Sequence, residues 1–94
     1  MIVMDYAKSI YIEFQLRCLL AQLILDLPSK TAMFVDELIS AKEYGLALET
    51  MAAAVLEEGF GLPRVAFEKM EHLANMMHMN HEVIVPELKE QVVG

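Results

Sequence analysis

Cysteine, tryptophan, proline and glycine are scarce in this chain: its 94 residues include one cysteine, no tryptophan, three prolines and four glycines. The single cysteine, Cys18, cannot form an internal disulfide, which favours a reducing compartment such as the cytoplasm. It lies in an apolar run and is expected to be a small buried hydrophobic residue. Because 56% of the residues are hydrophobic and turn-forming residues are few, the composition excludes a disordered chain and a turn-rich β fold. We therefore expect an all-α bundle of four to five helices in one domain, residues 1–94.

Positive charge is also scarce, since seven lysines and arginines face 14 aspartates and glutamates, for a net charge of −7. Phosphate binding depends on clustered cations, so direct nucleic-acid binding is not expected, and a basic protein is the better candidate partner. A helical enzyme such as a chorismate mutase would need several cations around a dianionic substrate, and this chain has only two arginines, Arg17 and Arg64. No Gly-rich phosphate loop, nucleophile elbow or zinc-protease spacing occurs. We expect a binding protein that is not an enzyme and needs no cofactor.

The first residues lack the basic region of a signal peptide. Asp5, Lys8, Glu13 and Arg17 interrupt any apolar run long enough to span a bilayer. The chain is therefore expected to be neither secreted nor membrane-spanning. Glu13 and Arg17 are four residues apart, which predicts an ion pair on the polar side of the first helix.

Apolar periodicity predicts helices at residues 5–27, 29–41, 43–58 and 63–79, and a short one at 86–92. Pro28 ends the first helix, Ser29 is a candidate N-cap for the second, Gly59 ends the third and Pro63 opens the fourth. The second half of the first helix is apolar almost all round, which suggests a central place in the bundle. The expected apolar stripes are Ala7, Tyr11, Phe14, Cys18, Ala21 and Leu25; Phe34, Val35, Leu38 and Ile39; Tyr44, Ala47, Leu48, Met51 and Val55; Ala66, Phe67, Met70, Leu73, Ala74 and Met77; and Leu88 with Val92.

The predicted helix 43–58 is the electrostatic centre of the sequence, because it holds four glutamates and no lysine or arginine. Its side opposite the apolar stripe combines small and apolar groups with glutamates at the rim, a surface that could receive a basic partner. Two acidic residues of the preceding helix extend the negative surface. The expected partner-binding residues are Asp36, Glu37, Glu43, Leu46, Glu49, Glu57 and Glu58.

Glu57 and Glu58 occupy the last helical turn before Gly59. Unpaired carbonyls make a helix C-terminus negative, so each exposed acid there costs roughly 0.3–1 kcal/mol. A broken local rule of this kind indicates function, unless Arg64 or Lys69 folds back to neutralise the pair.

Residues 70–82 are rich in methionine and histidine. His72, Met76 and Met79 share one helix face, and His78 and His81 are three residues apart, which are ligands suited to a soft metal such as Cu(I). Two other methionines of this run fit the core stripe, and no second cysteine or histidine cluster completes a site. We expect no metal site.

Three segments together resemble the MafI-type immunity proteins: EYGLALE at 43–49, LP at 62–63 and FEKMEHLANMM at 67–77. The resemblance covers roughly residues 34–79. It implies a small cytoplasmic protein related to the CdiI-type immunity partners of contact-dependent growth inhibition systems, each of which neutralises its own toxin domain, often an EndoU-type RNase. It also implies that Glu43 and the other glutamates of the third helix pair with toxin lysines or arginines, with Tyr44 or Leu46 as an apolar anchor. Tyr44 lies on the inward stripe, so Leu46 is the better candidate. The pattern names no particular toxin.

A self-associating helical regulator or adaptor is the alternative interpretation. In that case Val65, Met76 and Met79 would form the seam of a homodimer. Mass measurement in solution separates the two interpretations.

Overall fold

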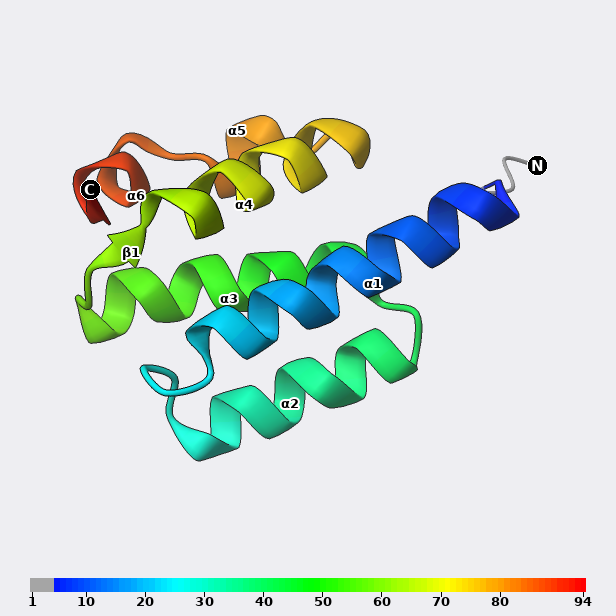
Figure 1. The fold of residues 1–94 in the computed structure, drawn as a ribbon, viewed down its shortest axis with the longest axis horizontal. Coiled ribbons are helices and arrows are strands. Elements are labelled where there is room, and N and C mark those ends of the chain that lie inside the picture. Colours follow the sequence, from blue (N-terminus) through cyan, green and yellow to red (C-terminus); the bar gives the residue numbers. More distant parts are fainter. Residues whose placement is uncertain (1–4) are drawn as a thin grey trace.

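Four long helices form the body of the protein, and two short helices and a two-stranded parallel pair complete it (Figure 1). The computed structural model describes residues 5–94, so residues 1–4 of the predicted domain lie outside the described part of the chain. The long helices are α1 (Tyr6–Leu23), α2 (Ser29–Ser40), α3 (Tyr44–Glu58) and α4 (Arg64–Met76). The shorter elements are β1 (Leu62–Pro63), α5 (Asn80–Val83), α6 (Pro86–Glu90) and β2 (Val92–Val93). The predicted all-α class is confirmed, with α5 as an additional turn of helix.

The radius of gyration is 12.5 Å, close to the roughly 12 Å expected of a folded domain of this length. The buried apolar side chains form one connected core. None of the helices in residues 5–94 is long and apolar enough to cross a membrane.

Helix α3 lies at the centre of the packing, because it contacts α1, α2, α4, α5 and α6. In Figure 1, α1 crosses in front of α3, with α2 on one side and α4 on the other. The whole predicted stripe of α3 is buried, and Ala47, Leu48, Met51 and Val55 are fully inaccessible to solvent. Gly59 ends the helix with a φ of +68°, and its N–H donates to the Val55 carbonyl. That left-handed conformation favours glycine, as the sequence predicts.

The predicted stripe of α1 is wrong, because it lies on the outward side of the helix. Phe14 is 61% exposed, Tyr11 is 41% exposed and Leu25 is 95% exposed, while Cys18 is only half-buried. The helix is apolar on two sides, so periodicity could not decide which side packs inward. The side that is buried carries larger aliphatic groups: Ile12, Leu16, Leu19, Leu20 and Leu23.

Several helix boundaries also differ from the predicted ones, and α4 begins at Arg64 with Pro63 at its N-cap, one residue later than predicted. Helix α1 ends at Leu23, and a turn carries the chain to Pro28, which takes the N-cap position of α2 in place of Ser29. Helix α4 ends at Met76, because His78 has a φ of +57° that interrupts the helix. In α2, Phe34 is about half exposed, whereas the other three residues predicted to face inward are buried.

The end of the chain is tied to the start of α4. Strands β1 and β2 pair in parallel, with Leu62 opposite Val92. The Arg64 guanidinium donates through Nε to the Gly94 carbonyl at 2.7 Å. Leu88 is fully buried as predicted, while Val92 reaches the core from a strand and not from the predicted helix. The pairing could not be read from local pattern, because its two strands are thirty residues apart and each is two residues long.

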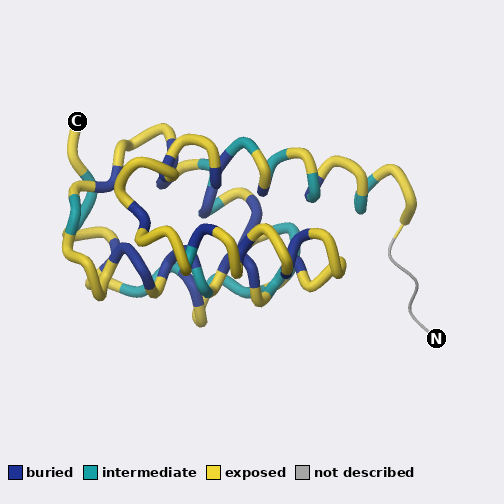
Figure 2. Tube along the Cα trace, turned by 90° about the horizontal axis from the view of Figure 1, so that it is seen from below, coloured by how far each residue is buried: buried dark blue, intermediate teal, exposed yellow. Residues whose placement is uncertain are grey.

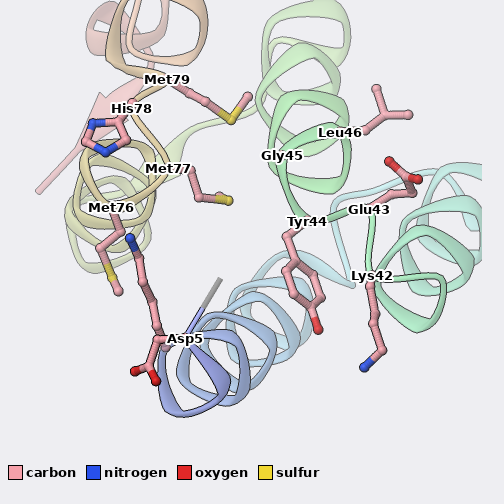
Figure 3. Close-up of a pocket in the computed structure, with 11 residues that line it drawn as sticks. Asp5, Lys42, Glu43, Tyr44, Gly45, Leu46, Met76, Met77, His78 and Met79 are labelled. Carbon is pink, nitrogen blue, oxygen red and sulfur yellow. The ribbon is translucent and has the colours of Figure 1, made fainter. Parts of the chain in front are cut away.

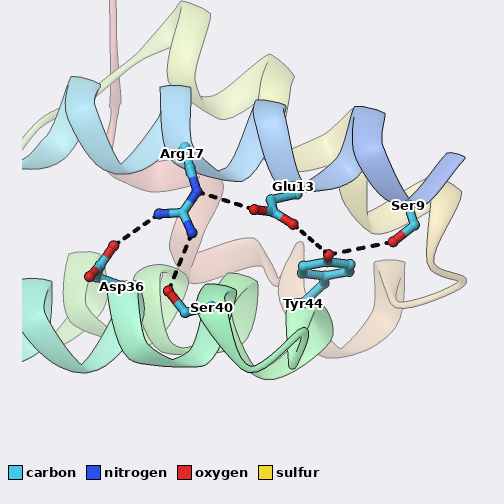
Figure 4. Close-up of polar contacts among 6 residues, drawn as sticks. All are labelled: Ser9, Glu13, Arg17, Asp36, Ser40 and Tyr44. Atoms are coloured by element: carbon cyan, nitrogen blue, oxygen red, sulfur yellow. Dashed lines mark hydrogen bonds and ion pairs between the residues drawn. The ribbon is translucent and has the colours of Figure 1, made fainter. Parts of the chain in front are cut away.

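A polar network joins the outer part of the α1–α3 contact (Figure 4). The buried Tyr44 ring directs its hydroxyl outward, where it donates to Glu13 Oε1 at 2.9 Å and accepts from Ser9 Oγ at 3.4 Å. Arg17 forms the predicted ion pair with Glu13 at 3.4 Å. The Tyr44 hydrogen bond is the main cause that lowers the pKa of Glu13 below its ordinary value of 4.5; desolvation opposes it and Arg17 assists it.

Arg17 extends this network to α2. It donates to Asp36 Oδ1 at 2.9 Å and to Ser40 Oγ at 3.3 Å (Figure 4). One guanidinium therefore connects two helices through three partners, a use that suits the planar fork of arginine better than the point charge of lysine.

Replacing Tyr44 by Phe should raise the pKa of Glu13 towards its ordinary value, because the largest stabilising contact to the carboxylate is lost while the buried ring is kept. A lowered pKa stabilises the fold above the ordinary value of 4.5, and this contribution disappears as the pH falls through the lowered value. The difference in the free energy of unfolding between wild type and Tyr44→Phe should therefore be largest at neutral pH and decrease as the pH falls. NMR titration measures the pKa of Glu13, and unfolding curves at several acid pH values measure the difference in stability.

Tyr11→Phe is the matched control, since it also removes one exposed hydroxyl, which contacts His72 and not Glu13. An unchanged pKa of Glu13 in Tyr44→Phe, or an equal rise in Tyr11→Phe, would contradict this assignment.

Candidate protein-binding surface

The outward face of α3 is exposed as the sequence predicts. We call this surface, together with Glu43 at the N-cap, the acidic face; no side chain of residues 5–94 forms an ion pair with its carboxylates. Leu46 is 46% exposed at one end of it. The exposed residues of the acidic face are Glu43, Leu46, Glu49, Ala53, Leu56, Glu57 and Glu58.

The two cations that could neutralise the C-terminal end of α3 have other partners. Arg64 donates to the backbone of Gly94, and Lys69 donates to the Gln15 side chain on α1. Within residues 5–94, Glu57 and Glu58 therefore keep their negative charge beside the unpaired carbonyls of their own helix end. The unfavourable placement that the sequence shows persists in the folded protein.

Asp36 does not join the acidic face. Its carboxylate points towards Arg17 of α1 and forms an ion pair with it, so its charge is balanced within the fold (Figure 4). Glu37 beside it is exposed and forms no ion pair in the described residues. Of the two acidic residues predicted on α2, only Glu37 presents an unpaired carboxylate.

A groove of about 760 Å³ opens at the N-terminal end of the acidic face (Figure 3). Glu43 and Leu46 line one side of it. The opposite side comes from the end of α4 and the loop that follows, and contributes Met76, Met77 and Met79. Methionine is flexible and polarisable, so such a wall adapts to apolar side chains of different shape.

The groove is electrically mixed, in contrast to the acidic face. Asp5 and Glu43 line it together with Lys8 and Lys42. Two charges of each sign give it no net attraction for a charged ligand, so its contribution to binding would be apolar.

A close contact joins the groove to α3. Met79 lies against Gly45, and a Cβ at that glycine would come within 2.9 Å of the Met79 sulfur. The residue pattern suggested the methionines of residues 70–79 as core residues or metal ligands, and only the fold places Met79 beside Gly45 of α3. A cluster of four methionines within residues 70–79 was the one signal in the sequence that could have indicated an adaptable surface.

The histidines form no metal centre in the described residues. Residues 5–94 contain no group of three or more His, Cys, Asp or Glu side chains placed to hold a metal ion. His72 instead contacts α1, where its Nε2 lies 3.2 Å from the Tyr11 hydroxyl and the two rings meet edge to face.

The three residues of the predicted dimer seam, two on α4 and one in the loop after it, do not share one open face. Val65 is 63% exposed, whereas Met76 and Met79 are partly buried and pack against the core.

Comparisons of the chain with protein-family models, with curated proteins and with solved structures found no match. The resemblance of residues 34–79 to MafI-type immunity proteins therefore rests on the residue pattern alone.

Replacing Glu57 and Glu58 together by lysine should stabilise the folded protein. Cations at a helix C-terminus interact favourably with its carbonyls, and the gain is roughly 0.3–1 kcal/mol for each exposed charge. Urea unfolding at low salt measures the change in the free energy of unfolding.

Glu49→Lys is the control, because Glu49 is exposed on the same helix but lies in its middle, away from the terminal carbonyls. A double variant that is no more stable than wild type would show that the helix end is already neutralised.

Proposed function

We propose that this protein is an immunity protein, which binds and neutralises a basic toxin domain through the acidic face. The observation that carries the proposal is the set of four α3 glutamates that are exposed and unpaired in the described structure. A protein of this size has no structural need for such a concentration of charge, and two of the carboxylates destabilise their own helix end.

Charge complementarity explains what the acidic face would contribute. Opposite charges steer two proteins together and raise association rates from about 10⁵–10⁶ towards 10⁸–10⁹ M⁻¹s⁻¹ at low salt. A toxin must be captured before it acts, so fast association is useful in itself. Screening over roughly 8 Å at physiological ionic strength would limit the benefit to a partner that closely approaches the acidic face.

Long residence requires an apolar anchor as well, because exposed charge pairs contribute little to slow dissociation. Leu46 and the methionine wall of the groove supply one beside the glutamates. A partner side chain that enters the groove would lose contact with water, while lysines or arginines around it pair with the rim. This arrangement matches the apolar centre and polar rim of tight interfaces.

Two arguments favour an RNase as the toxin. The residue pattern resembles immunity proteins whose toxins are often RNases of the EndoU type. RNase domains need a basic surface to hold RNA, and an acidic inhibitor can occupy that surface. The proposed mode of action is therefore direct binding without chemical change, with no cofactor.

An immunity gene should lie directly beside the gene of its toxin, and the first test uses the C-terminal domain of that toxin. Co-expression should restore growth, the two proteins should co-purify, and RNA cleavage by the toxin should fall in proportion to added immunity protein until the two are equimolar. An adjacent domain that neither co-purifies nor loses activity would refute the proposal.

The second test concerns the acidic face itself. In stopped-flow mixing with the toxin domain, Glu57→Lys/Glu58→Lys should slow association by tenfold or more at low salt, and the difference from wild type should narrow as salt rises. The matched control is Glu87→Lys/Glu90→Lys, which makes the same change in net charge on the exposed side of α6. Equal slowing in both variants would mean that only overall charge matters, and no slowing in either would remove this helix end from the interface.

Leu46→Ala tests the anchor separately. It should leave the association rate nearly unchanged and speed dissociation, because it removes an apolar contact and no charge. A Leu46→Ala variant with wild-type dissociation would place the anchor elsewhere.

A further inference from the structure

The outward side of α1 is a largely exposed apolar surface, covered within residues 5–94 only where Tyr11 contacts His72 and where Cys18 is half-buried. Figure 2 shows the length of this helix along one edge of the body, with exposed residues repeated from turn to turn. Phe14 lies near its middle at 61% exposure, flanked by exposed Ile10 and Tyr6. Exposed aromatic and branched residues at this density on one helix indicate an interaction surface.

The apolar residues of this surface are spaced like the contact positions of two paired helices. They follow one another at alternating intervals of four and three residues, the alternation of the a and d positions of a heptad, and so form one stripe that a partner helix can cover. We call this set the α1 seam: Ala7, Tyr11, Phe14, Cys18 and Ala21 of α1, with Leu25 in the turn that follows it.

The sizes of these residues match those of a second α1 that runs in the opposite direction. In the register centred between Phe14 and Cys18, Phe14 faces Cys18, Tyr11 faces Ala21 and Ala7 faces Leu25. Each large residue then meets a smaller one, the alternation that fills the space between two helices. A parallel pair would set Phe14 against Phe14 and leave a gap between two alanines, so the antiparallel pair packs better.

The charge of α1 also favours a second copy of this chain over a basic partner. Between residues 6 and 25 the charged side chains are Lys8, Glu13 and Arg17 alone, so this segment carries a small positive charge in a protein of net charge −7. Arg17 is already paired with Glu13 and with an aspartate of α2. Two copies can thus approach through α1 without bringing the acidic faces together, whereas a basic domain would find no carboxylates to pair with there.

A hollow of about 270 Å³ lies beside the seam. Ile10, Glu13, Phe14 and Arg17 enclose it, and their spacing of i, i+3, i+4 and i+7 is that of the hole which receives one side chain of a facing helix. The surface therefore offers both the projecting residues and a recess for those of its partner.

We propose that the protein forms a homodimer through antiparallel packing of the α1 seams. The 18 residues of α1 extend over about 27 Å, and a single pair of helices of this length buries less than the roughly 800 Å² per partner of a standard interface. We therefore expect a weak dimer that exchanges with monomer. It shares no residue with the acidic face, and it does not depend on the proposed toxin binding.

Sedimentation equilibrium of the full chain tests the dimer. The average mass of the wild type should rise with concentration from 10.6 kDa towards twice that value. Phe14→Glu should weaken dimerisation by at least tenfold, because it places a charge at the centre of the seam. Val65→Glu is the matched control, since it introduces the same charge at an equally exposed apolar residue on α4, and it should dimerise like wild type. Circular dichroism confirms that both variants are folded.

Disulfide formation tests the direction. In a Cys18→Ser background, a mixture of Ala7→Cys and Leu25→Cys proteins should form a mixed disulfide dimer, and neither protein alone should cross-link. Cross-linking of each protein with itself would refute the antiparallel register.

A wild type that stays monomeric at several hundred micromolar, or a Phe14→Glu variant that dimerises as well as wild type, would refute the dimer. A wild type that stays monomeric, together with loss of toxin binding in Phe14→Glu, would assign the seam to the toxin and refute the dimer.

Discussion

Burial of α3 against five other helices is the constraint on which the rest of the structure depends. Its apolar stripe is inaccessible to solvent, and removal of this much apolar surface from water is the main force that holds a domain of this size together. Only a narrow strip of α3 stays exposed, so its polar side chains are confined to that strip. This packing determines where the carboxylates of α3 lie, but it does not require that the exposed strip be acidic.

Two surfaces of different chemistry follow from the arrangement. The acidic face and its groove combine unpaired carboxylates with exposed leucine and methionine, which suits a basic protein with an apolar contact residue. The α1 seam is apolar and nearly free of acid, which suits a copy of itself. Because the two surfaces share no residue, one chain could bind its partner and a second copy of itself at the same time. The proposed dimer would then carry two acidic faces, one on each copy.

The sequence predicted those parts of the fold in which one side of a helix is clearly more apolar than the other. The stripes of α3 and α4 are buried as expected, apart from Met77, which is half-buried, because the charged residues of both helices lie on their opposite sides. The apolar pattern did not predict which side of helix α1 is buried, since both of its sides are apolar. Only contact with the neighbouring helices determines that Leu16 is buried and Phe14 is exposed. The β1–β2 pair, the contact of Met79 with Gly45 and the ion pair of Asp36 depend on residues distant in sequence. The exposure of the glutamates on α3 could thus be predicted from the sequence, whereas the pairing of Asp36 with Arg17 and the position of the groove methionines could not.

The central claim, that the acidic face of α3 is where a basic toxin domain binds, is tested most directly by NMR. Amide resonances of the ¹⁵N-labelled protein would be followed while the adjacent toxin domain is added. The account predicts that the largest shift changes fall on Leu46, Glu49, Ala53, Glu57 and Glu58, and extend to Met77 and Met79 across the groove. Changes confined to other helices, with the resonances of α3 unmoved at saturation, would contradict it.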